Sequence, residues 1–183
     1  MRRRYTRESY LELIASIRES MPGVALSTDM IVGFPGETDG DFEDTLPLTE
    51  QVGYHSMFSF KYSARPNTLA DKRMADDVDE NEKTRRIVAL QALQRRIQTG
   101  LNERMIGGEF EVLIDAASRR RDTELSGRTS SNVVVNLPGP PAWIGQSVRV
   151  RIERAGPHSV CGLPAGATGD GRALTGAGEA PRL

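Results

Sequence analysis

Residues 28–38 read TDMIVGFPGET, and this stretch decides the fold of the first part of the chain. Residues 30–34 form a nearly continuous apolar run, which is typical of a buried parallel strand covered on both faces. One acid, Asp29, lies directly before this run in the same predicted strand and would need a hydrogen-bonding partner there. The pattern therefore predicts a buried β-strand that carries one polar side chain.

A glycine-rich turn follows this strand and leads into a helix. Gly33, Pro35 and Gly36 end the strand, and Thr38 with Asp41 forms a capping box for the helix. Exposed backbone N–H groups at the carboxyl edge of a parallel sheet are a common place for small-molecule cofactors. Many βα turns contain glycine, so the turn alone is a weak indication of a site.

The rest of the first half alternates helices and strands. Helical spacing runs from residue 6 to a Pro-Gly pair at 22–23, and again from about 39 to 52. A second strand is predicted at 55–63, with Phe58, Phe60 and Tyr62 on one face. The order α-β-α-β with short connections predicts an α/β fold with a parallel sheet, incomplete because two strands do not make a stable sheet.

The second half has a different organisation. An acidic stretch at 75–80 reads as a linker, and a helix with a buried apolar stripe is predicted from about 82 to 105. The basic residues of this helix are expected to face water; they are Lys83, Arg85, Arg86, Arg95 and Arg96. After residue 107 apolar residues alternate with polar ones in several short strands, which predicts a small closed β-barrel. The Gly/Ala-rich tail from 165 is expected to be disordered.

Composition excludes several classes of protein. The 183 residues carry a formal net charge of −1, so bulk charge gives no argument for nucleic acid or membrane binding. Cys161 is the only cysteine, which excludes a disulfide framework and an iron–sulfur cluster held by this chain alone. His55 and His158 have no ligand partners nearby in sequence. With no long apolar run and no signal peptide, a cytoplasmic protein without membrane contact is expected.

Three blocks together resemble a known family. TDMIVGFPGET at 28–38, FKYSARPNT at 60–68 and GRTSSNVVVN at 127–136 are similar, in order and spacing, to radical-SAM tRNA methylthiotransferases of the MiaB type. The resemblance implies an α/β partial radical-SAM barrel followed by a small all-β TRAM barrel, which binds RNA. It divides the chain into the radical-SAM part at 1–74, the acidic linker and long helix at 75–106, the TRAM-like barrel at 107–163 and a disordered tail at 164–183.

The resemblance also implies a function. Such enzymes add a methylthio group to C2 of isopentenyladenosine next to the anticodon of tRNA, using S-adenosylmethionine and a [4Fe–4S] cluster. The family's CxxxCxxC motif is absent here, so the chain resembles the C-terminal part of such an enzyme and is expected to be inactive alone. Its partners would be tRNA and the missing N-terminal half. The alternatives are a stand-alone RNA-binding module without catalysis and a fragment of a ribosomal-protein methylthiotransferase.

By the same resemblance five residues are candidates for binding S-adenosylmethionine: Arg3, Asp29, Ile31, Gly33 and Tyr62. Ile31 and Gly33 would pack on the adenine, Tyr62 would border it, and Arg3 would pair with the carboxylate. Four of these residues also have a plain structural explanation: core packing for Ile31 and Gly33, a satisfied structural acid for Asp29, and a frayed terminus for Arg3.

Five further residues are candidates for RNA contact: Arg119, Arg120, Arg121, Arg128 and Asn132. Residues 103–154 contain eight arginines and seven acids, so only the clustering of cations can indicate RNA. The arginines would contact phosphates, and Asn132 a base or a ribose 2′-hydroxyl. A solvated turn is the alternative explanation for this cluster, and Trp143 is expected to close the barrel.

Overall fold

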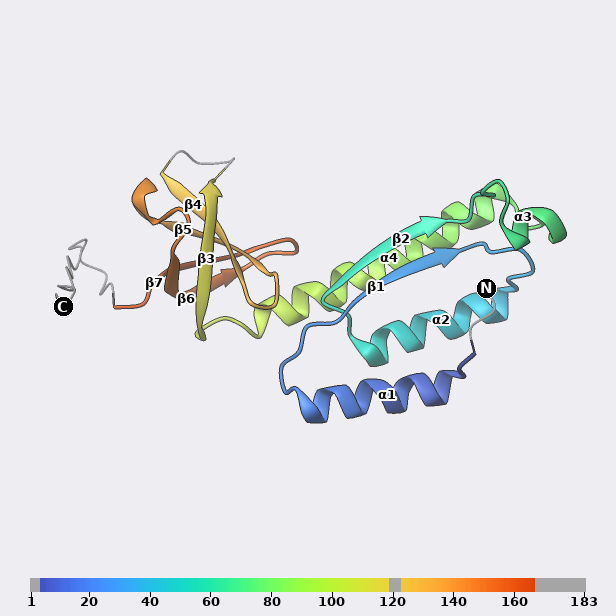
Figure 1. Ribbon diagram of the computed structural model, residues 1–183, viewed down its shortest axis with the longest axis horizontal. Helices are drawn as coiled ribbons and strands as arrows, with labels where there is room; N and C mark the ends of the chain where they lie inside the picture. The colour runs from blue at the N-terminus through green and yellow to red at the C-terminus, as the bar shows by residue number, and fades with distance from the viewer. Residues whose placement is uncertain (1–3, 119–122, 167–183) are drawn as a thin grey trace, which may run out of the picture. The chain divides into compact units, whose positions relative to one another are not determined.

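The computed structural model describes residues 4–118 and 123–166. These fall into two compact units, residues 1–104 and residues 105–183 (Figure 1). Four predicted site residues lie outside the described ranges: Arg3, Arg119, Arg120 and Arg121. The part of the predicted disordered tail from residue 167 onward also lies outside them. None of the helices within these ranges is long and apolar enough to cross a bilayer.

The first unit follows the predicted α-β-α-β order, with two further helices. Its elements are α1 (Arg7–Ser20), β1 (Ser27–Val32), α2 (Asp39–Val52), β2 (Ser56–Lys61), α3 (Leu69–Arg73) and α4 (Glu80–Glu103). The two strands pair in parallel, from Ser27 opposite Ser56 to Val32 opposite Lys61. β2 is shorter than the predicted range of 55–63. β1 ends at Val32 because Gly33 takes a left-handed backbone conformation, with φ +68°.

Side-chain caps decide where the helices of this unit begin. The Thr38 side chain accepts a hydrogen bond from the Asp41 N–H, and the Asp41 carboxylate accepts one from the Thr38 N–H. This pair confirms the predicted capping box of α2. Thr6 forms a similar box with Ser9 at the start of α1. Asp79 caps α4, so this helix begins two residues earlier than the apolar pattern predicted.

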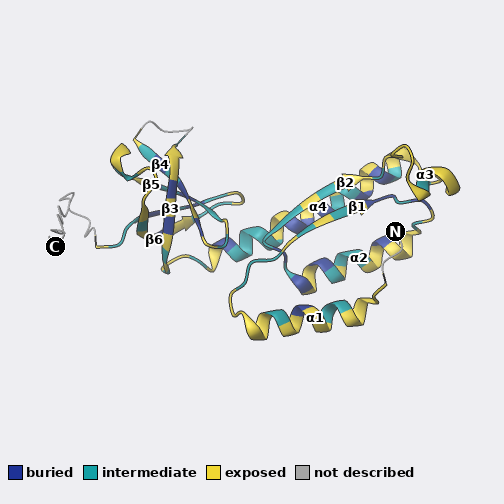
Figure 2. Cartoon of the chain, in the orientation of Figure 1, coloured by how far each residue is buried: buried dark blue, intermediate teal, exposed yellow. Residues whose placement is uncertain are grey.

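The core of the first unit lies on one side of the β1–β2 sheet. Val32 of β1 packs there with Phe42 of α2 and Leu90 of α4, and all three are almost fully buried. The other face is open: Phe58 is 63% exposed, Phe60 51% and Ile31 38%. Figure 2 shows exposed and intermediate residues along both strands. The prediction of a strand covered on both faces was therefore wrong, because helices cover only one side of the described sheet.

The second unit is a closed five-stranded barrel. Its elements are β3 (Glu109–Ala117), β4 (Glu124–Thr129), β5 (Val134–Pro138), the 3₁₀ turn η1 (Pro141–Trp143), β6 (Ser147–Ala155) and β7 (Val160–Pro164). The strand order around the barrel is β3-β4-β5-β7-β6. β5 and β7 pair in parallel, whereas the other neighbouring strands of the barrel pair antiparallel. Pro164 belongs to β7 rather than to the tail.

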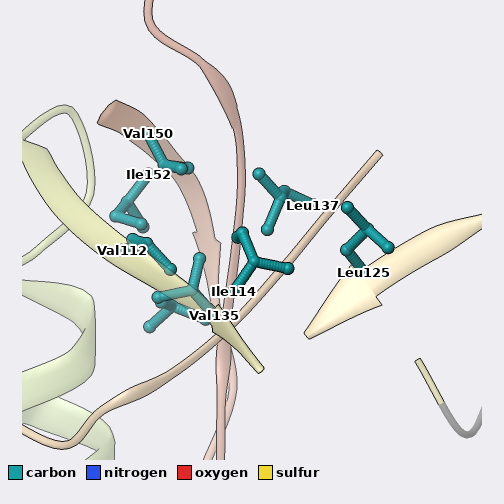
Figure 3. Close-up of a cluster of buried hydrophobic side chains, with 8 residues drawn as sticks. Val112, Ile114, Leu125, Val135, Leu137, Val150 and Ile152 are labelled. Carbon is teal, nitrogen blue, oxygen red and sulfur yellow. The ribbon is translucent and has the colours of Figure 1, made fainter. Parts of the chain in front are cut away.

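Alternating apolar residues fill this barrel, as their period of two predicted. Val112 and Ile114 of β3 are fully buried, whereas Leu113 between them is 52% exposed. The full core set is Val112, Ile114, Leu125, Val135, Leu137, Val150, Ile152 and Val160, and Figure 3 shows seven of them labelled as they converge from separate strands. Trp143 is half-buried and packs against this core.

Candidate functional site

The glycine turn at residues 33–36 lies at the carboxyl end of β1, where it leads into α2. Gly33 and Gly36 have φ of +68° and +82°, in the left-handed region that side chains disfavour. Gly33 is also buried, and a Cβ placed there would overlap the Lys83 Cγ. Only glycine therefore meets both the backbone and the packing requirements of position 33.

Two acids hold the backbone of this turn. Glu37 Oε2 accepts a hydrogen bond from the Phe34 N–H at 3.0 Å, and Asp77 Oδ1 accepts one from the Gly36 N–H at 2.8 Å. Asp77 belongs to the acidic stretch at 75–80 that the sequence assigns to a linker. That stretch contacts the first unit at three further points: Asp76 pairs with Lys83, Asp79 caps α4 and Glu80 pairs with Lys61.

Arg86 joins α4 to the same turn. Its guanidinium donates to the Glu37 carbonyl at 3.0 Å, to Asp39 Oδ1 at 2.9 Å and to Glu82 Oε1 at 2.7 Å. The side chain is only 4% exposed. Hydrogen bonds from Arg85 and Arg86 lower the pKa of Glu82 to about 2. A planar guanidinium suits this arrangement because its donors point to several acceptors at once.

The Lys83 side chain packs against Gly33 of the turn. Its Nζ is 2.6 Å from both carboxylate oxygens of Asp76 and 5.6 Å from the centre of the Tyr62 ring. The prediction that Lys83 and Arg86 face water was wrong, since both residues are 3% exposed. Helical spacing could have predicted this burial, because positions 83 and 86 lie on the same stripe of the helix as the buried Leu90 and Leu93. The predicted exposure rests on their charge alone.

The structure brings together some of the predicted cofactor-binding residues. Asp29 lies opposite Phe58 and Ile31 opposite Phe60 on the paired strands. Tyr62 donates its backbone N–H to the Val32 carbonyl at 2.8 Å, which places it beside the glycine turn. Its ring meets Phe34 edge-on, at 5.1 Å between centroids.

Asp29 does not lie in the buried environment that the sequence predicted. Its side chain is exposed, because it belongs to the strand face that no described helix covers. The expectation that Asp29 needs a buried hydrogen-bonding partner was therefore wrong. What remains is an acid next to exposed aromatic residues on an open sheet face.

Metal-binding groups are absent from the described ranges, where no three His, Cys, Asp or Glu side chains gather to hold an ion. Cys161 is half-buried in β7 of the barrel. With one cysteine in the whole sequence, the chain lacks the thiolates that an iron–sulfur cluster requires.

In the barrel the structure brings two of the predicted RNA-contact residues together. Arg128 of β4 donates from Nη1 to Asn132 Oδ1 at 2.9 Å, and its Nε lies 3.3 Å from Asp115 Oδ2. Arg128 and Asp115 are 49% and 43% exposed. Asn132 has φ +61°, as a tight turn between β4 and β5 requires. Asn132 therefore orients Arg128 on the barrel surface, while Asp115 offsets part of its charge.

Similarity to known proteins agrees with this architecture. Residues 103–162 match the family model described as the TRAM domain. Over 162 residues the chain is 47% identical to the tRNA-2-methylthio-N(6)-dimethylallyladenosine synthase of Methylococcus capsulatus, covering 88% of this chain and 35% of that protein. It is 44% identical over 164 residues to the synthase of the same name from Parabacteroides distasonis, covering 90% of this chain and 36% of that one.

The chain thus spans about a third of the length of the curated relatives it matches. Its resemblance to the family extends through both units, since the matches cover about nine tenths of the chain. The chain carries a TRAM domain and is a relative of the tRNA-2-methylthio-N(6)-dimethylallyladenosine synthases.

Proposed function

We propose that this chain works as part of a tRNA methylthiotransferase, in which its barrel binds tRNA and its first unit belongs to a radical-SAM barrel. The observation that carries the proposal is the 44–47% identity to synthases of that name over about nine tenths of the chain. The substrate would be the N6-dimethylallyladenosine of tRNA, to which a methylthio group is added. The names of these relatives favour tRNA over a ribosomal protein.

The open sheet face supports the assignment of the first unit to a larger barrel. Two parallel strands alone are a marginal sheet, and this one leaves three large apolar side chains exposed: Ile31, Phe58 and Phe60. Apolar exposure of this kind on neighbouring strands is typical of a surface that other parts of a protein cover. Further strands and their helices would complete the sheet and enclose that face.

The first unit fits part of S-adenosylmethionine. Ile31 and Phe60 are neighbours on the open face and offer an apolar surface to an adenine ring, close to the Gly33 turn and Tyr62. Asp29 on the same face would bind a polar group of the cofactor, and Arg3 its carboxylate. When bound to a reduced cluster, this cofactor supplies a radical that abstracts hydrogen.

The [4Fe–4S] cluster does not fit this chain, because the chain has a single cysteine. Its ligands would come from the part of the protein that the relatives have in addition. That part is a proposed partner of this chain, whether in one polypeptide or in two.

The tRNA contact would lie on the barrel, at Arg128, Asn132 and the arginines at 119–121. Fluorescence anisotropy with a labelled tRNA anticodon stem-loop at two salt concentrations tests it. Affinity should fall as salt rises, and the triple substitution R119A, R120A, R121A should lower the salt slope by about one unit per lost phosphate contact. Arg95→Ala, on an exposed part of α4, is the matched control. Salt-independent binding, or an unaffected triple variant, would contradict the proposal.

Asn132→Ala tests recognition of ribose separately. If Asn132 contacts a 2′-hydroxyl, the variant should lose preference for RNA over DNA of the same sequence. A variant that weakens RNA and DNA binding equally would indicate that Asn132 only orients Arg128.

A stand-alone RNA-binding module is the second candidate, favoured by the separate closed barrel and by the absence of cluster thiolates. Co-expression with the remaining two thirds of the Methylococcus capsulatus synthase discriminates between the two. Methylthiolated tRNA, detected by mass spectrometry only when both parts are present, supports the enzyme. Retained RNA binding without methylthiolation supports the module.

A further inference from the structure

A pocket of about 670 Å³ lies in the first unit, at the end of the sheet opposite the glycine turn. Gly23 and Val24, which precede β1, and His55, which precedes β2, form part of its lining. The end of α2 and the last turns of α4 complete it. Because both strands run in parallel and the glycine turn follows the end of β1, this pocket is separate from the proposed cofactor site.

Positive charge dominates the lining. Arg18 comes from α1, Arg96 from α4 and Arg104 from the C-cap of α4, whereas Glu50 is the one acid among the lining residues. Arg96 Nη2 lies 3.0 Å from Glu50 Oε1, but both side chains are more than 60% exposed, so solvent screens this pair. The lining keeps a surplus of cationic groups.

The two arginines of α4 lie on either side of a glycine. Arg96, Gly100 and Arg104 follow one another at intervals of four residues, on one helix face. A Cβ at Gly100 would meet no neighbouring segment within 4 Å, so the helix surface between the two arginines is open at that point. The helical rise separates their Cα atoms by about 12 Å, and long arginine side chains can reach inward from both ends.

His55, which forms part of the pocket lining, also has an unsatisfied ring nitrogen. Its Nδ1 is buried and has no hydrogen-bond partner, while its backbone N–H donates to the Leu26 carbonyl at 2.8 Å. Buried polar atoms without a partner are rare in folded proteins. Burial lowers the pKa of His55, and the neighbouring Arg18 lowers it further. An anion beside the ring would oppose these effects, because a nearby negative charge favours the protonated imidazole.

Arg18 is held in place by a helix end. Its guanidinium donates from Nη2 to the carbonyl of Val52, the last residue of α2. This bond uses one of the five N–H donors of the side chain. A purely structural role for these arginines would be to neutralise the negative ends of α2 and α4. Such a role predicts no ligand and does not explain His55 Nδ1.

We propose that this pocket binds a phosphate group, with Arg18, Arg104 and His55 as its donors. Guanidinium groups match phosphate oxygens in bidentate geometry, and a protonated imidazole would add a third charged donor. The group belongs to a free or terminal phosphate, or to a phosphodiester of a nucleic-acid backbone. This assignment does not depend on the proposed tRNA methylthiotransferase function.

Histidine NMR of the whole chain, titrated with inorganic phosphate, tests the proposal. The chain has two histidines, and exposed His158 lies in the other unit, so it is an internal control. Phosphate should shift the His55 imidazole resonances and raise the pKa of His55, and should leave His158 unchanged. Equal shifts of both histidines, or none, would overturn the proposal.

Two variants on one helix separate binding from stability. Arg104→Gln should weaken phosphate binding about tenfold or more, the effect of losing a hydrogen bond to a charged group. Arg95→Gln, outside the pocket on the same helix, should bind as the unaltered chain does. If both variants bind equally, the proposal fails. Should Arg104→Gln lower the melting temperature, His55→Gln repeats the test without changing a helix-end charge, with phosphate binding measured by isothermal titration calorimetry because the His55 resonances are lost. Normal binding by His55→Gln also overturns the proposal.

Dimethyl phosphate distinguishes the two sources of the group. This diester carries one negative charge and has the chemistry of a nucleic-acid backbone. Binding of inorganic phosphate alone assigns the pocket to a free or terminal phosphate, and binding of both compounds assigns it to a backbone phosphodiester. Failure of both compounds to perturb His55 overturns the proposal, whatever the barrel does with tRNA.

Discussion

Gly33 is the residue at which backbone conformation and packing both exclude a side chain. Its φ of +68° disfavours any other residue, and the Lys83 side chain occupies the space that a Cβ would take. Gly36 shares the first constraint, with φ +82°, but has open space around it. Comparing substitutions at Gly33 and Gly36 therefore separates the cost of backbone strain from the cost of overpacking.

Gly33→Ala should lower the free energy of unfolding by about 2–4 kcal/mol, the sum of left-handed strain and overpacking. Gly36→Ala should lose only about 1 kcal/mol, from strain alone. Urea denaturation of both variants and the unaltered chain measures the difference. Equal losses would show that Lys83 moves aside at no cost and that packing does not restrict position 33.

Asn67 is a second position at which the backbone conformation restricts the residue type. It is one of two described residues other than glycine with a positive φ, which is +69°. Asparagine is among the few residues other than glycine that enter this region readily. Asparagine at position 67 is therefore compatible with the turn that precedes α3 (Leu69–Arg73).

The carboxyl group of Glu82 makes the stability of the first unit depend on pH. The pKa of its carboxyl falls from 4.5 to about 2 through hydrogen bonds from Arg85 and Arg86. A lowered folded-state pKa contributes stability that is present above pH 4.5 and is lost as the pH falls through about 2.

Glu82→Gln should reduce the loss of unfolding free energy between about pH 6 and about pH 3. Urea denaturation at both pH values measures it. A variant with exposed Glu12 replaced by Gln should retain the full loss, and identical behaviour of the two variants would contradict the role of Glu82.

Helix α4 is the element that organises the first unit. Leu90 on one stripe reaches the core beneath the sheet, and Arg86 and Lys83 on the same stripe hold the glycine turn and the acidic stretch. The helix thus buries apolar and charged groups side by side. The charged ones tolerate burial because each has an acid partner, and Arg86 also has a backbone carbonyl.

Arg86→Lys tests this role of α4. A lysine cannot reach the carbonyl of Glu37, Asp39 and Glu82 in one arrangement, so unfolding free energy should fall by about 1–3 kcal/mol. Arg85→Lys, on the adjacent residue that is 58% exposed, should change it by less than about 0.5 kcal/mol. Thermal and urea denaturation report both. Equal effects would indicate that charge alone, without the guanidinium geometry, holds the turn.

At the scale of the whole molecule, one unit has a complete core and the other does not. The barrel closes on itself and buries eight apolar side chains within it. The first unit leaves one sheet face bare, with Phe58 63% exposed. The chain spans about a third of the length of the relatives it matches.

The purified chain should bind no [4Fe–4S] cluster, because one cysteine cannot supply the thiolates that hold it. Anaerobic reconstitution followed by an iron count and an absorbance spectrum measures this, with a full-length relative such as the Methylococcus capsulatus synthase as the positive control. A stoichiometric cluster in this chain would contradict the prediction and would require ligands other than cysteine.

Most of the element order followed from the sequence. Capping boxes at Thr38 and apolar periods of 3.6 and 2 are properties of residues close together in the chain, so they identified α2, the long helix and the barrel strands. The barrel core was predictable for the same reason. Strand ends and helix α3 were missed, because short turns depend on caps and backbone conformations that periodicity does not contain.

Only the tertiary structure decided which side of each element is covered. An apolar run at residues 30–34 indicates a strand that can be buried on two faces, but helices cover one face of the described sheet. Charge at Lys83 and Arg86 indicates exposure, but acids distant in sequence make their burial favourable. The meeting of Arg18, His55 and Arg104 around one pocket likewise depends on the packing of α1, β2 and α4. Burial and pairing are set by contacts between segments far apart in the chain, and local pattern does not encode them.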